Sequence, residues 1–423
     1  MAIVVAIFVT AVVTAGLTLL LSSLLTREKK IERKIETLYD IEDGQFERSM
    51  EGLLPPHILP GNKITPLVNG DQIFPAMLEA IGAARRSICF ETFIYWSGDV
   101  GRKFCDALAE RARAGVKVHV LLDWLGSKKM DPELLGRMEQ AGVELQRYHP
   151  LKWYNVWQLN HRTHRNLLVV DGTVGFTGGV GIADEWAGNA QDPDHWRDSH
   201  FRLDGPAVAQ MQGAFMDNWM KTHTAVLHGE DYFPALEPAG SCKAQVFQSS
   251  PQEGSESVRL MYLLSIACAA RSIRISNAYF VPDDLSVEML CAAAKRGVKV
   301  QVIVPGKYID THTVRRAGRS RWGPLLEAGV EMHEYQPTMY HCKVMVVDDL
   351  WTSVGSTNFD NRSFRLNDEA NLNVLDRDFA KGQARLFEMD LARSRRITLE
   401  EWRNRPWTEK LKERAAGLLR AQL

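Results

Sequence analysis

The stretch HCKVMVVD, residues 341–348, recurs in the first half of the chain as HRNLLVVD, residues 164–171. In each copy a polar triplet that begins with histidine leads into an apolar run and ends on aspartate. Short apolar runs bounded by polar residues are typical of buried β-strands. Because side chains repeat every second residue along a strand, His341 and Lys343 should lie on the same face.

Three further pairs of segments repeat in the same order around these two stretches. RRSICFETFIY (85–95) matches ARSIRISNAYF (270–280), GVKVHVLLD (115–123) matches GVKVQVIVP (297–305), and AGVELQRYHP (141–150) matches AGVEMHEYQP (328–337). In each half these strand-like runs alternate with helix-like segments, which predicts an α/β sandwich. A duplicated α/β domain brings equivalent residues together across a pseudo-two-fold axis, so we predict two related domains that share one cleft.

Composition excludes several classes of protein. The chain has 423 residues, of which 24% are charged and 45% hydrophobic, with a formal net charge of −1, which excludes intrinsic disorder. Near-neutral charge disfavours nucleic acid as a partner. The six cysteines show neither a CxxC pair nor metal-type spacing and predict single thiols in a reducing compartment. The sequence contains no phosphate-cradling P-loop, dinucleotide fingerprint or clustered metal-ligand motif.

Residues 1–26 carry no ionisable side chain. A helix of that length rises roughly 39 Å, more than the ~30 Å hydrocarbon core requires. Nothing basic precedes the run, which favours a retained anchor over a cleaved signal peptide. Five basic residues follow between Arg27 and Lys34. The positive-inside rule therefore predicts a single-pass protein of the inner (cytoplasmic) membrane whose globular part faces the cytoplasm; a solvated helical stalk is the alternative for residues 27–36.

Pro55, Pro56 and Pro60 break any helix and mark a linker before the first repeat. The chain then divides into a transmembrane anchor (1–26), a charged stalk and linker (27–62), a first α/β domain (63–235) and a second α/β domain with a C-terminal helix (236–423).

Three further segments each allow two interpretations. WYNVWQLNHR (153–162) suits a core or lid segment and equally a lipid-contacting rim. RRAGRSRWG (315–323) is expected to be a basic loop, solvated in preference to binding anionic headgroups. The last segment, 406–423, predicts an amphipathic helix, and docking on the body is favoured over membrane binding. Its apolar stripe comprises Leu411, Ala415, Leu418 and Leu419.

The repeated stretch carries residue types suited to phosphate chemistry. The second half offers, in order, His341, Lys343, Asp348, Ser356 and Asn358, and the first half His164, Asn166 and Asp171. A neutral imidazole can attack phosphorus or donate a proton, and a lysine ammonium neutralises phosphate oxygens. A lone histidine on a strand is usually structural, but its recurrence favours catalysis, with the two imidazoles close enough to flank one phosphorus.

These residues resemble the phospholipase D superfamily, whose signature is a twice-repeated His-x-Lys-x4-Asp with a downstream Gly-Ser-x-Asn, and within it the bacterial cardiolipin synthases. The resemblance covers about residues 63–400 and is most specific in 340–374, with support from NAYFVPDD (277–284) and WRD (196–198). It implies phosphatidyl transfer without metal or cofactor. One motif histidine attacks the phosphodiester and forms a phosphohistidine, while the other protonates the leaving alcohol and then deprotonates the incoming one.

The resemblance also assigns roles to single residues. Lys343, Ser356 and Asn358 would hold the substrate phosphate, together with Asn166. Glu369 would be the carboxylate that orients a catalytic histidine, and Asp198 its first-half counterpart. Asp171 and Asp348 would tie the motif strands to nearby backbone. By analogy with the family, His164 is the expected nucleophile and His341 the acid and then the base.

The first half departs from the family pattern at Asn166, which stands in the motif lysine position, and at Gly181, where an asparagine often follows. An amide can hydrogen-bond a phosphate but cannot neutralise it, and losing one cation plausibly costs ~100-fold or more in rate. Three explanations of Asn166 compete. The lysine was replaced deliberately, the protein is a natural degenerate copy, or a neighbouring arginine, Arg162 or Arg165, supplies the charge. We favour a point replacement in a working framework, because the rest of the motif is intact.

The resemblance predicts that two phosphatidylglycerols give cardiolipin and glycerol, with membrane phospholipids and the bilayer as partners. Phospholipase D hydrolysis shares the first half-reaction and is the second interpretation. A non-catalytic protein that binds anionic phospholipid is the third, and Asn166 is the feature that favours it. The membrane anchor and the neutral charge disfavour a nuclease.

Overall fold

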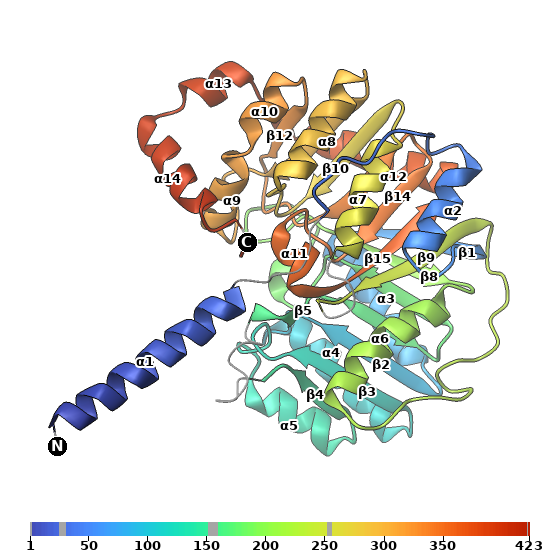
Figure 1. The fold of residues 1–423 in the computed structure, drawn as a ribbon. Coiled ribbons are helices and arrows are strands. Elements are labelled where there is room, and N and C mark those ends of the chain that lie inside the picture. The colour runs from blue at the N-terminus through green and yellow to red at the C-terminus, as the bar shows by residue number, and fades with distance from the viewer. Residues whose placement is uncertain (1, 25–30, 151–159, 252–255, 421) are drawn as a thin grey trace.

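The computed structural model describes residues 2–24, 31–150, 160–251, 256–420 and 422–423. Figure 1 shows two α/β halves, one above the other, and helix α1 (Ala2–Leu24) projecting from them. The side chains of α1 are described for residues 2–18, and all of them are exposed. Within the described part of the chain, no helix is both long enough and apolar enough to cross a membrane.

Strands from both halves form one sheet. The first half contributes β1 (Leu59–Val68), β2 (Ser87–Thr92), β3 (Lys117–Asp123), β4 (Glu144–Tyr148), β5 (Arg162–Thr163), β6 (Leu167–Val170), β7 (Val174–Gly178) and β8 (Ser199–Asp204). The second half contributes β9 (Cys242–Ser249), β10 (Ser272–Asn277), β11 (Lys299–Pro305), β12 (Glu331–Tyr335), β13 (Lys343–Val347), β14 (Trp351–Gly355), β15 (Asn367–Leu375) and β16 (Ser394–Ile397).

The sheet is symmetric about its centre. Its order is β16-β12-β11-β10-β13-β14-β15-β9-β1-β8-β7-β6-β2-β3-β4, and β5 pairs with β15 off this path. In each half three consecutive strands run parallel (β2-β3-β4 and β10-β11-β12) and the strands nearer the centre antiparallel, while the second half adds β16 as an antiparallel edge strand. β1 and β9 pair antiparallel and join the halves. The α/β architecture predicted from the sequence is confirmed, and the repeat appears as the same strand order in both halves.

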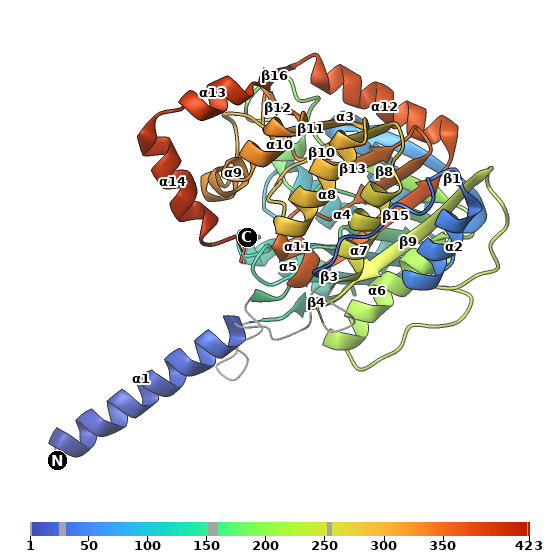
Figure 2. The same ribbon diagram turned by 45° about the horizontal axis from the view of Figure 1, so that its top comes forward.

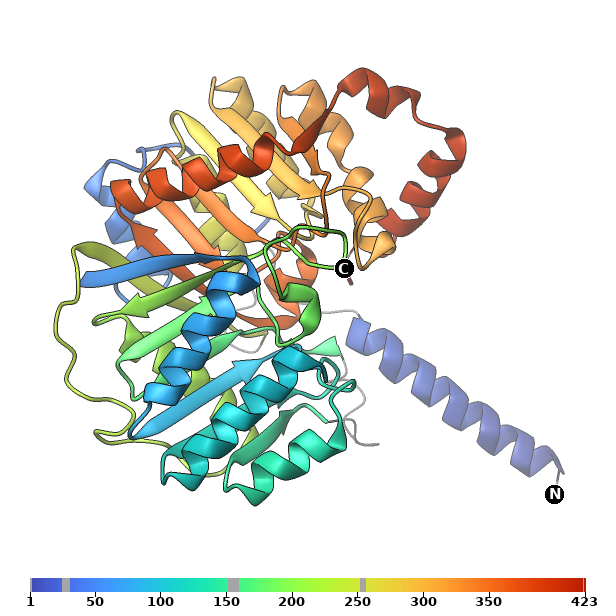
Figure 3. The ribbon, with the colours of Figure 1, turned by 180° about the vertical axis from the view of Figure 1, so that it is seen from behind.

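Helices surround this sheet. They are α2 (Gly44–Leu53), α3 (Asn69–Ala83), α4 (Asp99–Arg113), α5 (Pro132–Gln140), the 3₁₀ turn η2 (Asp184–Trp186), α6 (Val208–Thr222), α7 (Ser257–Ala267), α8 (Asp284–Lys295), α9 (His312–Arg319), α10 (Trp322–Glu327), α11 (Asn361–Arg365), α12 (Arg377–Leu391), α13 (Leu399–Asn404) and α14 (Trp407–Gly417). Most of them pack on the two faces of the sheet, while α13 and α14 pack on other helices (Figure 1). Helix α4 shows why helices dock: it buries Val100, Phe104 and Leu108, which share one helical face. Figure 3 shows α3, α4 and α5 in front of the first half and α12 in front of the second.

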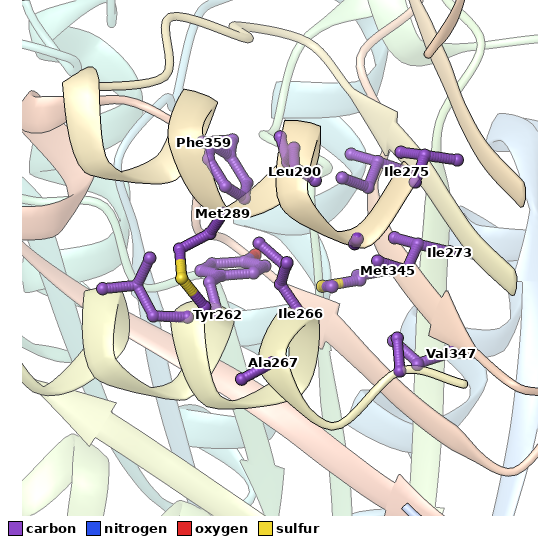
Figure 4. Close-up of a cluster of buried hydrophobic side chains, with 14 of the residues drawn as sticks. Tyr262, Ile266, Ala267, Ile273, Ile275, Met289, Leu290, Met345, Val347 and Phe359 are labelled. Carbon is purple, nitrogen blue, oxygen red and sulfur yellow. The ribbon is translucent and has the colours of Figure 1, made fainter. Parts of the chain in front are cut away.

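The second half has a core between its helices and strands. In Figure 4, Tyr262 and Ile266 of α7 face Ile273 and Ile275 of β10 and Met345 of β13. All of these side chains are buried. Burying an aliphatic side chain of this size stabilises the fold by about 1.5–3 kcal/mol relative to leaving it exposed.

Part of the segment expected to be stalk and linker packs against this core. Phe46 and Met50 of α2 are fully buried there, and the ring of Phe46 lies 5.1 Å from that of Trp351. Figure 2 shows α2 on the opposite side of the body from α1. Residues 31–54 therefore belong to the second half in space, although they precede the first half in sequence.

Another hydrophobic core spans the two halves. Met211 and Phe215 of α6 share it with Val246 of β9 and Leu372 of β15. Because α6 belongs to the first half and both strands to the second, this packing fixes one half against the other. That rigidity positions residues contributed by both halves to one site.

The expected basic loop at 315–323 is helical. Its residues form most of α9 and the start of α10. Arg319 makes ion pairs with Glu334 and Glu413, and Arg321 pairs with Asp284. The loop expectation was wrong because Arg319 stabilises helix packing through two buried acidic partners, Glu334 and Glu413, which the local sequence does not reveal.

Two other expectations have mixed outcomes. All six cysteines are free, as predicted. The C-terminal segment does form a helix, but its stripe of Leu411, Ala415, Leu418 and Leu419 is exposed, so the expectation that this stripe docks on the body was wrong. Glu413 and Ala416 are buried instead. Residues 153–159 of the aromatic segment lie outside the described residues.

Candidate active site

The first-half histidine is held by the second half. His164 follows β5, whose pairing with β15 continues as a hydrogen bond of 2.9 Å from the His164 amide to the carbonyl of Asp368. This pairing sets Glu369 beside the imidazole, with 3.1 Å between His164 Nδ1 and Glu369 Oε2. The side chain of His164 is 12% exposed and that of Glu369 is fully buried.

The second-half histidine is held by the first half in the same way. A β-bridge joins Arg197 to Tyr340, and the amide of His341 donates to the carbonyl of Arg197 over 2.8 Å. As a result, His341 Nδ1 lies 2.7 Å from Oδ2 of the buried Asp198. The pairing is thus exchanged between the halves, since each supplies the carboxylate for the other's imidazole.

Both carboxylates favour the ionised form. Burial raises the pKa of Asp198, but the charges of His341 and Lys343 outweigh it and hold the pKa below its usual value. Burial likewise raises the pKa of Glu369, and the interaction with His164 and a hydrogen bond from Ser356 outweigh it. A carboxylate on Nδ1 selects the tautomer in which Nε2 carries the lone pair, and it stabilises the imidazolium when Nε2 takes a proton.

Lys343 sits against the ring of His341. Its Nζ lies 3.0 Å from Nδ1 and 3.1 Å from Nε2, and it donates to the His341 carbonyl over 2.7 Å. Burial and then the charge of Lys343 lower the pKa of His341. Burial also lowers the pKa of Lys343 itself. An anion that binds beside the neutral His341 imidazole can compensate the positive charge of the buried Lys343 amine.

Ser356 and Asn358 follow β14 at the same end of the sheet. Ser356 Oγ donates to Oε2 of Glu369 over 2.5 Å, so the hydroxyl aligns the carboxylate that holds His164. Asn358 is buried, and among the described residues its Oδ1 has no hydrogen-bond partner. That oxygen can accept a hydrogen bond from a ligand hydroxyl.

Asn166 occupies the first-half position that corresponds to Lys343. Its Oδ1 accepts hydrogen bonds from Thr92 Oγ1 (3.1 Å) and the amide of Phe93 (3.3 Å), and its Nδ2 donates to the carbonyl of Gly178 (3.3 Å). The amide is buried and satisfied by its own half. It supplies no charge where the other half has an amine.

The two motif aspartates lie at the far ends of β6 and β13 from the histidines. Asp171 accepts from the backbone amides of Arg85, Arg86 and Ser87. Asp348 accepts from the equivalent amides, those of Ala270, Arg271 and Ser272. Each carboxylate therefore fixes the motif strand to the start of the neighbouring strand and has no contact with the imidazoles.

Comparison with known proteins agrees with this geometry. The family described as "cardiolipin synthase, PLD-like domain" matches residues 77–194 and 262–391, the two halves of the repeat. The major cardiolipin synthase ClsA of Bacillus subtilis is 35% identical over 361 residues, covering 85% of this chain and 75% of that protein. The chain belongs to the cardiolipin synthase family of phospholipase D-like proteins.

Other relatives extend the comparison. Cardiolipin synthase A of Pseudomonas fluorescens is 33% identical over 363 residues, covering 85% of this chain and 75% of its own. Among solved structures, phosphatidylserine synthase of Haemophilus influenzae matches with a TM-score of 0.66 at 14% identity, covering 90% of this chain and 100% of that one. At that identity the structural match shows the shared fold.

In this member of the cardiolipin synthase family, the two arginines near Asn166 are held by contacts within the fold. The buried guanidinium of Arg165 donates to the carbonyls of Ala214, Ser249 and Glu369 and pairs with Asp217. Arg162 donates to the carbonyl of His149 and lies 3.6 Å from Asp123. Both arginines are engaged in structural contacts, which disfavours the third explanation of Asn166, that one of them supplies the charge to the phosphate.

Two tryptophans complete the site of this cardiolipin synthase homologue. Trp186 Nε1 donates to Asp198 Oδ2 over 3.0 Å, and the rings of Trp186 and Trp196 lie 5.2 and 5.5 Å from that of His341. The indole of Trp186 donates to Asp198 as Ser356 donates to Glu369 in the other half. The first-half counterpart of Ser356 is Gly179, where a side chain has no room, because a Cβ there would come within 2.4 Å of Asp198. The sequence patterns assign neither tryptophan a role, and the position of Trp196 two residues before Asp198 was the available signal.

The described residues contain no cluster of His, Cys, Asp and Glu side chains that could hold a metal ion. The polar groups that meet at the histidines are instead the two carboxylates, one amine and one hydroxyl.

Proposed function

We propose that this chain is a phosphatidyltransferase that converts two phosphatidylglycerols into cardiolipin and glycerol through a phosphohistidine. The observation that carries the proposal is the exchanged pairing of His164 with Glu369 and of His341 with Asp198. Two imidazoles held through Nδ1 can act as nucleophile and as acid and base in one reaction. Membership of the cardiolipin synthase family supports the choice of substrate.

In the first step, Nε2 of His164 attacks phosphorus of one phosphatidylglycerol. The P–N bond forms as the bond from phosphorus to the glycerol oxygen breaks, and His341 donates the proton that this oxygen takes. The bound phosphodiester anion pairs with Lys343, and this weakens the repulsion that lowers the pKa of His341. Substrate binding therefore promotes the protonation that the first step requires.

In the second step, a hydroxyl of another phosphatidylglycerol attacks the phosphohistidine. His341 accepts the hydroxyl proton, the new P–O bond forms, and the P–N bond to His164 breaks. Glu369 and Asp198 stabilise the positive charge that each imidazole acquires in turn. The products are cardiolipin and the regenerated pair of histidines.

Phosphate binding in this mechanism depends mainly on the second half. Lys343 pairs with the phosphodiester there, Asn358 Oδ1 can accept a hydrogen bond from a substrate hydroxyl, and Asn166 contributes at most a hydrogen bond from the first half. Since one preorganised donor contributes about 3 kcal/mol to the transition state, we propose that the chain turns over slowly.

The membrane placement is part of the same proposal. Residues 1–26, without an ionisable side chain, anchor the chain in the cytoplasmic membrane, and the basic residues that follow keep the catalytic part on the cytoplasmic side. Within residues 2–18 of α1, where side chains are described, all side chains are exposed and most are apolar, which supports this role.

A lipid assay tests the proposal. Full-length chain and its Asn166→Lys variant are incubated with phosphatidylglycerol in mixed micelles, and cardiolipin and free glycerol are quantified by mass spectrometry. We expect both products in equal amounts, more from the variant, and neither after His164→Ala. Phosphatidic acid in place of cardiolipin would make the chain a hydrolase. No product from either protein would leave a phospholipid-binding pseudoenzyme.

A further inference from the structure

Helix α14 and the turn that follows it expose a cluster of large apolar side chains. Trp407 is 74% exposed, Leu411 59%, Leu418 85% and Leu419 52%. Among the described residues outside α1, the other large apolar side chains exposed to this degree belong to separate segments of the chain, such as Leu38 and Met389. Exposed apolar groups that gather on one element mark an interaction surface, whereas single ones are ordinary.

The body holds the opposite face of α14, so the exposed face is fixed outward. Glu413 is buried between Arg319 and Arg405, with ion pairs of 3.0 and 2.7 Å. Ala416 packs in an apolar cluster with Val314 and Ala317. Rotating the helix to hide its leucines would expose these contacts and break the ion pairs that Glu413 makes with Arg319 and Arg405.

Basic side chains flank the apolar face. Lys412 and Arg414 are exposed, and within the described part of the chain neither makes an ion pair. The acidic residue of the last helical turns, Glu413, points inward. An apolar stripe with unpaired cations beside it is the pattern of a helix that lies in the interface of an anionic membrane.

The position of α14 agrees with such a membrane contact. In Figures 1 and 2, α14 and α1 lie on the same side of the body, and Figure 3 shows the same arrangement from behind. The chain end that follows α14 also reaches towards the catalytic histidine. Leu423 shares an apolar cluster with Tyr279, whose ring lies 6.4 Å from that of His341.

We propose that α14 is an interfacial helix that docks on an anionic phospholipid bilayer. Trp407, Leu411, Leu418 and Leu419 enter the boundary between headgroups and acyl chains, while Lys412 and Arg414 meet the phosphates. This contact orients the body on the membrane and is distinct from the anchor formed by residues 1–26. It does not depend on the catalytic assignment.

Depth-dependent quenching tests the proposal in the full-length chain. An environment-sensitive fluorophore is attached at Leu418→Cys, and at Leu53→Cys on α2 as a matched exposed control; the parent chain, labelled in parallel, corrects for its own cysteines. The proteins are reconstituted into vesicles of phosphatidylglycerol and phosphatidylcholine that carry brominated acyl chains. We expect quenching at position 418 and none at position 53.

A charge-reversal variant tests the anionic preference. Lys412→Glu combined with Arg414→Glu changes exposed side chains and should not alter thermal unfolding. It should remove most of the quenching at position 418 in phosphatidylglycerol vesicles, and vesicles of phosphatidylcholine alone should do the same to the parent. Equal emission at positions 418 and 53, or quenching independent of lipid charge, would overturn the proposal. Protection at position 418 without vesicles, dependent on protein concentration, would overturn it in favour of a second copy.

Discussion

His164 and Glu369 are 205 residues apart in the chain, yet Nδ1 of the imidazole lies 3.1 Å from Oε2 of the carboxylate. The matching contact, from His341 to Asp198, spans 143 residues in the opposite direction. Each half therefore lacks the carboxylate that orients its own histidine. The site exists only when the two halves are joined, and the continuous sheet through β1 and β9 joins them.

Replacing Glu369 by glutamine should lower kcat and leave the fold intact. The amide keeps the shape of the side chain but cannot stabilise the imidazolium of His164. Positioned acid–base groups contribute roughly 10²–10⁴-fold, so we expect a loss in this range. Steady-state kinetics of Glu369→Gln beside the surface control Glu388→Gln would measure it. A loss of equal size in the control, or a collapse of thermal stability, would contradict a catalytic reason for the effect.

Replacing Asp198 by asparagine should shift the pH profile towards acid. The Asp198 charge raises the pKa of His341, whereas burial and Lys343 lower it. Without the carboxylate the pKa of His341 falls further, so His341 loses its proton at a lower pH. The first step, which needs that proton, then slows at a lower pH. The alkaline limb of kcat/KM should therefore move to lower pH. An unmoved limb, or one displaced to higher pH, would show that His341 is not the acid.

The sequence did not predict which carboxylate pairs with which histidine, although it did point to the four residues themselves. The motif pattern identified the histidines, Glu369 and Asp198. Which carboxylate meets which histidine depends on β5, a strand of two residues that pairs across the halves. Periodicity does not reveal a strand this short, and local sequence does not specify its distant partner.

The repeats predicted the α/β architecture because apolar strands and helical segments recur in one order. The docked face of α14 was mispredicted for a definite reason. The hydrophobic stripe rule assumes that leucines face the body, but the buried face is set by Glu413 between Arg319 and Arg405. Ion pairs between distant segments also made α9 a helix where a basic loop was expected.

His200 should make the protein less stable in mild acid. Burial lowers the pKa of His200 from 6.5 to about 4. Because the folded state resists protonation while the unfolded state accepts it, stability is full above pH 6.5 and falls as the pH decreases towards 4. His200→Asn, which introduces the residue found at the equivalent Asn371, should reduce this fall. Thermal unfolding of both proteins across that window is the measurement, and parallel curves would contradict the prediction.

Restoring the first-half lysine should raise turnover more than affinity. Lys343 still binds the phosphate, whereas the absent charge acts mainly in the transition state. Asn166→Lys should therefore raise kcat by roughly 100-fold or more, with a smaller change in KM. Asn166→Met, similar in length but uncharged, is the matched control and should give no gain. An equal gain from methionine, or no gain from lysine, would show that charge at this position does not limit the reaction.

Trapping of the covalent intermediate tests the central claim most directly. The Asn166→Lys protein is mixed with phosphatidylglycerol labelled at phosphorus and denatured at alkaline pH, where a phosphohistidine survives, and its peptides are analysed by mass spectrometry. We expect the labelled phosphorus, as a phosphatidyl group or its alkaline breakdown product, on the peptide that contains His164, and no protein-bound label after His164→Ala. Label on the peptide with His341, or cardiolipin formed with no protein-bound phosphate at any time, would contradict it.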